Sequence, residues 1–234
     1  MNNSQIKVNK INLIIFILIS LSFLIGFILN EDSSGGGALD FKHEIVSINE
    51  FKNGIFSALT SIKYESSRMP LFLIINAFNP FSDNIQNIRI SNFIFNILIC
   101  IFFLICLLKQ KKINNNLVLI VGSLLLLSPY FRTSSYWAHQ ENLPFLFMFM
   151  SMIFFHKKFQ IENFIIEKNF LNIFFIASLS SLSFYSDQKF IFLSLFFYLY
   201  FIFYRLNLKN FLVISLIFFL TSIPALYLFY LWQG

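Results

Sequence analysis

The run INLIIFILISLSFLIGFIL, residues 11–29, decides the class of fold to which this chain belongs. It contains no charged residue and is long enough for a helix that crosses the hydrocarbon core of a membrane. The polar stretch NEDSSGGGALDFKHE, residues 30–44, follows directly. Because the apolar run is longer than the core of a signal peptide, we expect a retained first span with a polar segment outside it.

The composition of the whole chain supports the same class. It is 57% hydrophobic and only 12% charged, with a mean hydropathy of +0.73, whereas about a quarter of the residues of a soluble domain are charged. We therefore predict an all-α integral membrane protein that forms one multi-spanning domain over residues 1–234. The expected spans are residues 11–29, 90–108, 116–131, 143–155, 170–185, 190–204 and 211–232, with an outer loop over residues 30–89.

The distribution of charge predicts the orientation of these spans. With the N-terminus inside, the cytoplasmic segments hold ten of the 17 basic residues and two of the 11 acids, a net charge of +8. The outer segments hold seven bases and nine acids, a net charge of −2. This asymmetry follows the positive-inside rule and predicts a multi-pass plasma-membrane protein. The basic pI thus reflects orientation, and the absence of a basic solvent-facing domain argues against a nucleic-acid partner.

The first outer loop contains an amphipathic pattern. Its apolar residues recur at helical spacing, and they are Phe41, Ile45, Ile48, Phe51 and Ile55. We expect a helix over residues 40–56 that lies on the outer membrane surface, with a polar side formed by Asp40, His43, Glu44, Ser47 and Glu50. Asp40 at its start is either an N-cap or a carboxylate held at the headgroup plane.

Two further outer loops also combine acids and bases. The loop SPYFRTSSYWAHQENLP, residues 128–144, carries Arg132, His139 and Glu141 between two spans. The short loop YSDQK, residues 185–189, carries Asp187 and Lys189, which either pair with each other or face a cavity. Carboxylates can take a proton from an acceptor hydroxyl while cations hold a leaving phosphate, so such loops suit transfer from a lipid-linked phosphate.

Four segments carry a family resemblance: SGGGALDF at 34–41, RMPLF at 68–72, NIRISNFIFN at 87–96 and the loop 128–144. Together they resemble the multi-spanning glycosyltransferases of the GT-C fold, which use polyprenyl-phosphate sugars. The resemblance implies transfer of a sugar from a polyprenyl-phosphate donor to a lipid, glycan or protein acceptor on the extracytoplasmic face.

The resemblance also implies roles for individual residues. Asp40 is the expected general base on the acceptor, with Asp32 and Glu31 as second choices, and Glu141 is expected to orient the acceptor or support the base. The residues expected to bind the substrate are Arg68, Arg132 and Lys189, followed by His139, Asp187 and His43. The arginines rank first because a guanidinium fork matches phosphate. No cofactor or metal site is predicted, since carboxylates are present for a divalent cation but no ligand spacing specifies one.

The length of the chain departs from that family, whose members carry several more spans and often a soluble C-terminal domain. We therefore expect a truncated enzyme, or one that needs a partner subunit to complete its fold. A transporter or flippase is the first competing hypothesis, although the predicted spans carry no interior charges. A polysaccharide polymerase, which uses clustered arginines, and a non-catalytic membrane subunit are the remaining two hypotheses.

Overall fold

The computed structural model describes residues 9–61, 69–82, 84–110, 113–159, 166–204 and 208–231. Every regular element in these residues is a helix, which confirms the all-α prediction. The first half contains α1 (Lys10–Ile28), α2 (Gly37–Asn53), α3 (Ile55–Leu59), α4 (Leu71–Ala77), α5 (Ile85–Leu108), α6 (Asn115–Leu127) and α7 (Pro129–Tyr136). The second half contains η1 (Gln140–Asn142), α8 (Leu143–Phe159), α9 (Ile166–Ser186), η2 (Gln188–Phe190), α10 (Ile191–Tyr204) and α11 (Leu208–Leu231).

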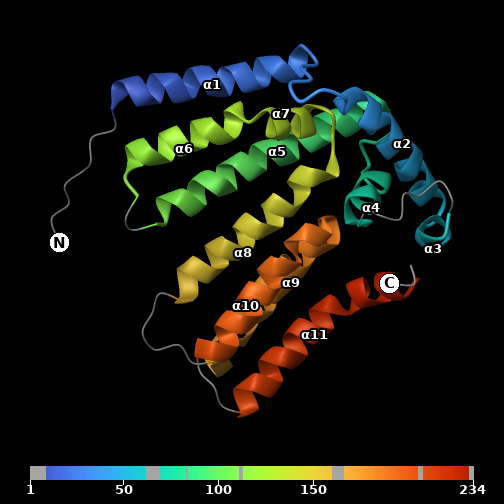
Figure 1. Ribbon diagram of the computed structural model, residues 1–234, viewed down its shortest axis with the longest axis vertical. Coiled ribbons are helices and arrows are strands. Elements are labelled where there is room, and N and C mark those ends of the chain that lie inside the picture. The colour runs from blue at the N-terminus through green and yellow to red at the C-terminus, as the bar shows by residue number, and fades with distance from the viewer. Residues whose placement is uncertain are drawn as a thin grey trace.

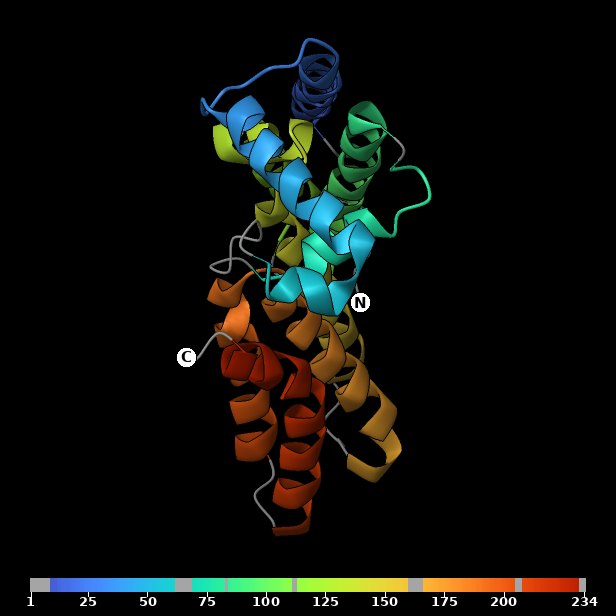
Figure 2. The same ribbon diagram turned by 90° about the vertical axis from the view of Figure 1, so that its right-hand side faces the viewer.

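The helices pack around two apolar clusters. The larger cluster joins α1 to α8 and also includes buried residues of α9 and α11, and the smaller one joins α9, α10 and α11. Figure 1 shows α1, α5 and α6 running side by side, with the short helices α2, α3 and α4 gathered at one end of the molecule. Figure 2 shows α9, α10 and α11 below the helices of the first half, with α9 packed against α8. The polar loops therefore meet on the side of the larger cluster.

Among the described residues, three helices are long and apolar enough to cross a membrane. They are Lys10–Ile28, Ile85–Leu108 and Leu208–Leu228, and they match the first, second and last predicted spans. Most of the large apolar side chains of α1 are exposed on the structure, as expected for a helix surrounded by lipid. The predicted spans 143–155, 170–185 and 190–204 are helical in α8, α9 and α10, although the apolar helices Phe170–Ser186 and Gln188–Phe203 are shorter than a full span.

The predicted span 116–131 is not one straight helix. It breaks at Ser128 into α6 and α7, which are bent by 61° and make a fourth span only if they are counted together. Ser128 is extended, its hydroxyl accepts a hydrogen bond from the Phe131 amide (3.4 Å), and Pro129 follows as the first residue of α7. The break arises because the residue before a proline avoids the helical region and the proline itself has no N–H for the α6 ladder. The bend moves Arg132 off the axis of α6.

The first outer loop is more ordered than the sequence predicts. It is largely helical, and α5 begins at Ile85 rather than at residue 90. The amphipathic helix exists, but as α2 and α3, which are separated by Gly54 at φ +152. Its Phe41, Ile48 and Phe51 are buried in the larger cluster. The apolar side that we expected to meet the membrane surface is therefore covered by protein.

The polar side of α2 also differs from the prediction. Glu44 and Ser47, which we expected among the exposed polar residues, are buried. Asp40 does not cap the helix, since the N-cap is Gly36 in the left-handed conformation (φ +80) and Asp40 lies in the first turn. The carboxylate of Asp40 is therefore exposed rather than engaged with the helix end.

Candidate functional site

A polar cavity lies between the first and second outer loops. Its volume is about 450 Å³, and Asp40, His139 and Glu141 all line it. The rest of the lining is Ser34, Gly35, Leu125, Ser128, Tyr130, Phe131, Thr133, Ser134, Asn142 and Phe145. The structure thus brings together three of the predicted site residues from segments about a hundred positions apart in the sequence.

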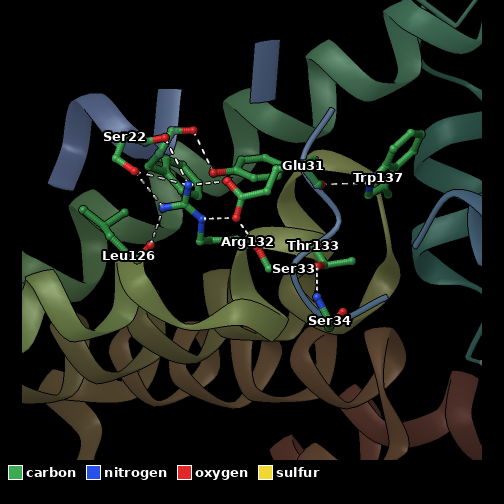
Figure 3. Close-up of polar contacts among 10 residues, drawn as sticks. Ser22, Glu31, Ser33, Ser34, Leu126, Arg132, Thr133 and Trp137 are labelled. Atoms are coloured by element: carbon green, nitrogen blue, oxygen red, sulfur yellow. Dashed lines mark hydrogen bonds and ion pairs between the residues drawn. The ribbon is translucent and has the colours of Figure 1, made fainter. Parts of the chain in front are cut away.

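Hydrogen bonds between the two loops hold this cavity in shape. The Ser34 amide donates to Thr133 Oγ1 (3.0 Å), and the ring of His139 contacts the Gly37 carbonyl through Nε2 (2.9 Å). Nearby, the indole N–H of Trp137 donates to the Glu31 carbonyl (3.1 Å). Figure 3 shows the Ser34 and Trp137 contacts crossing from the loop after α1 to α7. Residues 31–37 are therefore tied to residues 133–139 along their length.

The local chain direction at His139 depends on a tight helix end. The amide of Trp137 donates to the Thr133 carbonyl, and the amide of His139 donates to the Ser134 carbonyl (3.1 Å). Between them Ala138 adopts φ +54 and is fully buried. This is the Schellman arrangement that ends a helix with a left-handed residue. It turns the chain from α7 into η1, so that His139 and Glu141 both reach the cavity.

His139 and Glu141 form a pair whose proton content follows from their contacts. Because the Gly37 carbonyl only accepts hydrogen bonds, Nε2 of His139 must carry a proton. Nδ1 of His139 lies 3.6 Å from Glu141 Oε2, which also accepts a hydrogen bond from the Ser134 hydroxyl (3.1 Å). An ionised carboxylate has no proton to offer Nδ1, so the attractive state is an imidazolium beside a carboxylate.

The pKa directions of the two groups agree with that assignment. Burial alone would lower the pKa of His139, but the contact with Glu141, the bond to the Gly37 carbonyl and the negative charge of Asp40 outweigh it and raise the pKa. Partial burial would raise the pKa of Glu141, yet His139 and the Ser134 hydroxyl lower it to about 2. The cavity therefore brings the imidazole of His139 together with the carboxyl groups of Asp40 and Glu141.

Arg132 and Glu31 form a second pair of a different kind. The guanidinium binds both carboxylate oxygens, with Nε–Oε1 and Nη2–Oε2 distances of 2.9 and 2.5 Å. Its remaining hydrogens go to Ser22 in α1 and to the Leu126 carbonyl in α6, as Figure 3 shows. This bond to Arg132 lowers the pKa of Glu31. Both residues lie outside the lining of the polar cavity, and every nitrogen of Arg132 already has an acceptor.

Two glycines allow these contacts. A Cβ at Gly26 would lie 2.4 Å from Glu31 Oε2 and 2.7 Å from Arg132 Nη2. A Cβ at Gly37 would lie 2.6 Å from the methyl group of Thr133. Such distances are shorter than real carbon contacts, so the pair and the loop contact require glycine at these positions.

The other predicted site residues lie apart from the cavity lining. Asp32 is half-buried, and its Oδ1 has no hydrogen-bond partner. His43 is exposed on α2. Asp187 caps η2 by accepting the Lys189 amide (2.9 Å), and the two side chains form a loose ion pair at 3.9 Å, which is one of the two arrangements expected for them. Arg68 lies outside the described residues.

Two buried polar residues near the cavity carried no predicted role. Asn142 stood out in the sequence only as a polar residue, and it is buried and lines the cavity. Arg89 is also buried, lies 4.3 Å from the ring of Trp137 and donates to the Tyr136 carbonyl (2.9 Å). For Arg89 the available signal was the helical spacing of Arg89, Asn92 and Asn96 in an otherwise apolar span, since such spans rarely carry polar groups without partners.

The described residues contain no metal centre built from acidic, histidine or cysteine side chains. Among them no group of three His, Cys, Asp or Glu side chains lies close enough to hold a metal ion. Comparison with protein-family models, curated proteins and solved structures found no match for this chain. The site therefore stands on its geometry alone.

Proposed function

We propose that the chain is a membrane glycosyltransferase, or the N-terminal part of one, that transfers a sugar from a polyprenyl-phosphate donor on the extracytoplasmic side. The observation that carries the proposal is the polar cavity that Asp40, His139 and Glu141 share. This set supplies a carboxylate that can act as a base and a cation that can stabilise a phosphate.

The proposed reaction uses the cavity residues in distinct roles. The acceptor hydroxyl passes its proton to Asp40 as its oxygen forms a bond to the anomeric carbon of the sugar. The bond between that carbon and the phosphate oxygen breaks, and polyprenyl phosphate leaves with the electron pair. The imidazolium of His139 faces the phosphate, and Glu141 keeps His139 protonated. This assigns to His139 the phosphate contact that the sequence favoured for Arg132, since Arg132 is fully engaged with Glu31, Ser22 and Leu126.

A neighbouring apolar cavity supports a lipid-linked donor. It has a volume of about 270 Å³ between α1, α5 and α6, and its lining is almost wholly apolar. Leu125 contributes to the lining of both this cavity and the polar one. A donor with a polar phosphate sugar and an apolar tail would match two adjoining spaces of these opposite characters.

The test is the replacement Asp40→Asn in membrane vesicles that hold the full chain. The probe is a radiolabelled polyprenyl-phosphate hexose, and the readout is label transferred to acceptors in the vesicle. We expect a loss of at least about a hundredfold, because a general base contributes that much or more. The matched control is Glu50→Gln, an acid on the same helix that does not line the cavity.

The outcomes separate the possible errors. Full transfer by the Asp40→Asn protein would remove Asp40 from the role of base. No transfer by the unaltered chain, with or without added membrane extract as a source of a partner subunit, would overturn the proposed function. Equal losses in Asp40→Asn and Glu50→Gln would point to damage to α2 rather than to the chemistry.

A further inference from the structure

Asn142 presents an unusual arrangement at the wall of the polar cavity. Its side chain is 4% exposed, yet it belongs to the cavity lining. Its Nδ2 donates to Asn96 Oδ1 (2.7 Å), the Phe131 carbonyl (3.1 Å) and Ser135 Oγ (3.1 Å). Two of these acceptors belong to Asn96 and Ser135, which lie outside the cavity lining, so the amide nitrogen is held on the side away from the cavity.

The orientation of this amide is fixed by groups that can only accept. Asn96 Nδ2 donates to the Asn92 carbonyl (2.8 Å), which leaves Asn96 Oδ1 as the atom that meets Asn142. The Phe131 carbonyl imposes the same requirement independently. A reversed Asn142 would place its oxygen against two other oxygens at hydrogen-bond distance, which is repulsive.

The oxygen of Asn142 is consequently left for the cavity. Within the described part of the chain no N–H or O–H group donates to Asn142 Oδ1. The two ends of a side-chain amide lie on opposite sides of Cγ, so a nitrogen turned into the protein turns the oxygen outward. Leaving such an acceptor unsatisfied when a ligand covers it costs about 1–3 kcal/mol. A ligand that fits must therefore bring a donor.

We infer that Asn142 is a specificity-determining residue that accepts a hydrogen bond from a hydroxyl group of the bound sugar, with Asn96 as its positioning residue. The inference rests on the proposed function and adds the class of group that is read. The cavity lining also includes the carboxyl groups of Asp40 and Glu141, whose oxygens accept hydrogen bonds. A wall so rich in acceptors suits a ligand rich in hydroxyl donors.

The experiment measures binding to the full chain in lipid nanodiscs. The probes are polyprenyl-phosphate glucose, galactose and mannose, together with analogues of the best binder in which one hydroxyl at a time is replaced by hydrogen or by fluorine. For the unaltered chain we expect one position at which both replacements weaken binding about tenfold, since neither hydrogen nor fluorine can donate. In Asn142→Ala the parent sugar and those two analogues should bind equally.

A matched control comes from a second buried asparagine pair. Asn92 Nδ2 donates to Asn76 Oδ1 at 2.6 Å, and both side chains are buried, but neither lines the cavity. Asn76→Ala should lower thermal stability while keeping the tenfold preference for the hydroxyl. If Asn142→Ala does not accumulate, Asn142→Ser replaces it, because a hydroxyl at that position is too short to occupy the place of Oδ1.

Each outcome decides the inference. Loss of discrimination in the Asn142 variant, with discrimination kept in Asn76→Ala, supports it. Discrimination that survives in the Asn142 variant overturns the role of Asn142 and leaves the proposed function standing. A fluorinated analogue that binds as well as the parent overturns the acceptor role, since fluorine can only accept. If the unaltered chain binds none of the three sugars, the proposed function fails together with the inference.

Discussion

The molecule contains two acid–base pairs that look alike in the sequence and differ in the structure. Glu31–Arg132 and Glu141–His139 each join an acid to a base in the outer loops. Arg132 gives every nitrogen to acceptors in α1, α6 and the loop after α1, so this pair fastens three segments together. His139 and Glu141 instead open onto the polar cavity, where half of the Glu141 side chain is exposed. The two pairs therefore differ in the groups that surround them and not in the charges that they carry.

The largest effect is expected from the removal of Arg132, which tests its structural role. In Arg132→Met the Glu31 carboxylate loses its partner, and the Ser22 and Leu126 carbonyls each lose a donor. We expect unfolding in detergent to become easier by about 3 kcal/mol, which corresponds to a melting temperature lower by roughly 6–12 °C. Lys189→Ala removes an exposed pair at 3.9 Å and should cost less than about 1 kcal/mol. Equal effects of the two changes would contradict the structural role of Arg132.

A smaller change, at Gly26 in α1, tests the same contact between Arg132 and Glu31. Alanine is the better helix former, by about 1 kcal/mol, so Gly26→Ala would stabilise α1 if the space allowed it. The added carbon would instead lie 2.4 to 2.7 Å from Glu31, Tyr136 and Arg132, and we expect a net loss of about 2 kcal/mol. The measurement is thermal unfolding of the single variants and of Gly26→Ala combined with Arg132→Ala. The double variant should lose less stability than the two single variants lose together, since Arg132→Ala removes one of the groups that the new Cβ would meet. Losses that simply add would contradict this collision.

The smallest effect is expected for the His139–Glu141 pair, whose contribution to stability depends on pH. The pKa of His139 is raised in the folded chain, so its charge contributes stability below the ordinary histidine value of about 6.5 and loses that contribution as the pH rises through the raised value. The pKa of Glu141 is lowered to about 2, so its contribution is present above about 4.3 and is lost as the pH falls further. The pair is therefore strongest between these limits.

Melting temperatures of the unaltered chain and of His139→Gln between pH 5 and 9 measure this contribution. At pH 6 the unaltered chain should melt at a higher temperature than the variant. The corresponding difference in the free energy of unfolding should be less than about 1 kcal/mol, because the Glu141 side chain is half exposed. The difference should shrink by pH 9. A difference that stays constant over this range would show that His139 does not hold the proton assigned to it.

Parts of the candidate site could be predicted from the sequence. Asp40, His139 and Glu141 stood out because polar groups beside apolar spans need a reason, and the structure places all three at one cavity. Arg132 and Glu31 stood out for the same reason, but the pattern could not show that they bind each other across 101 positions. The contacts of Asn142 could not be foreseen, because an uncharged amide gives no signal until its three acceptors are known.

Some features of the fold could likewise be predicted from the sequence, and others could not. The sequence was sufficient to predict the helical content and three helices that are long and apolar enough to cross a membrane, because length and hydropathy fix whether a helix can lie in lipid. Helical periodicity in residues 41–55 showed that one side of a helix is covered but not what covers it, since protein and lipid are equally apolar. The contacts between segments, by contrast, show that α4 and its neighbours cover α2, that Arg132 is held by Glu31, and that His139 and Glu141 line a cavity. These outcomes depend on contacts between segments far apart in the chain, and no local pattern encodes them.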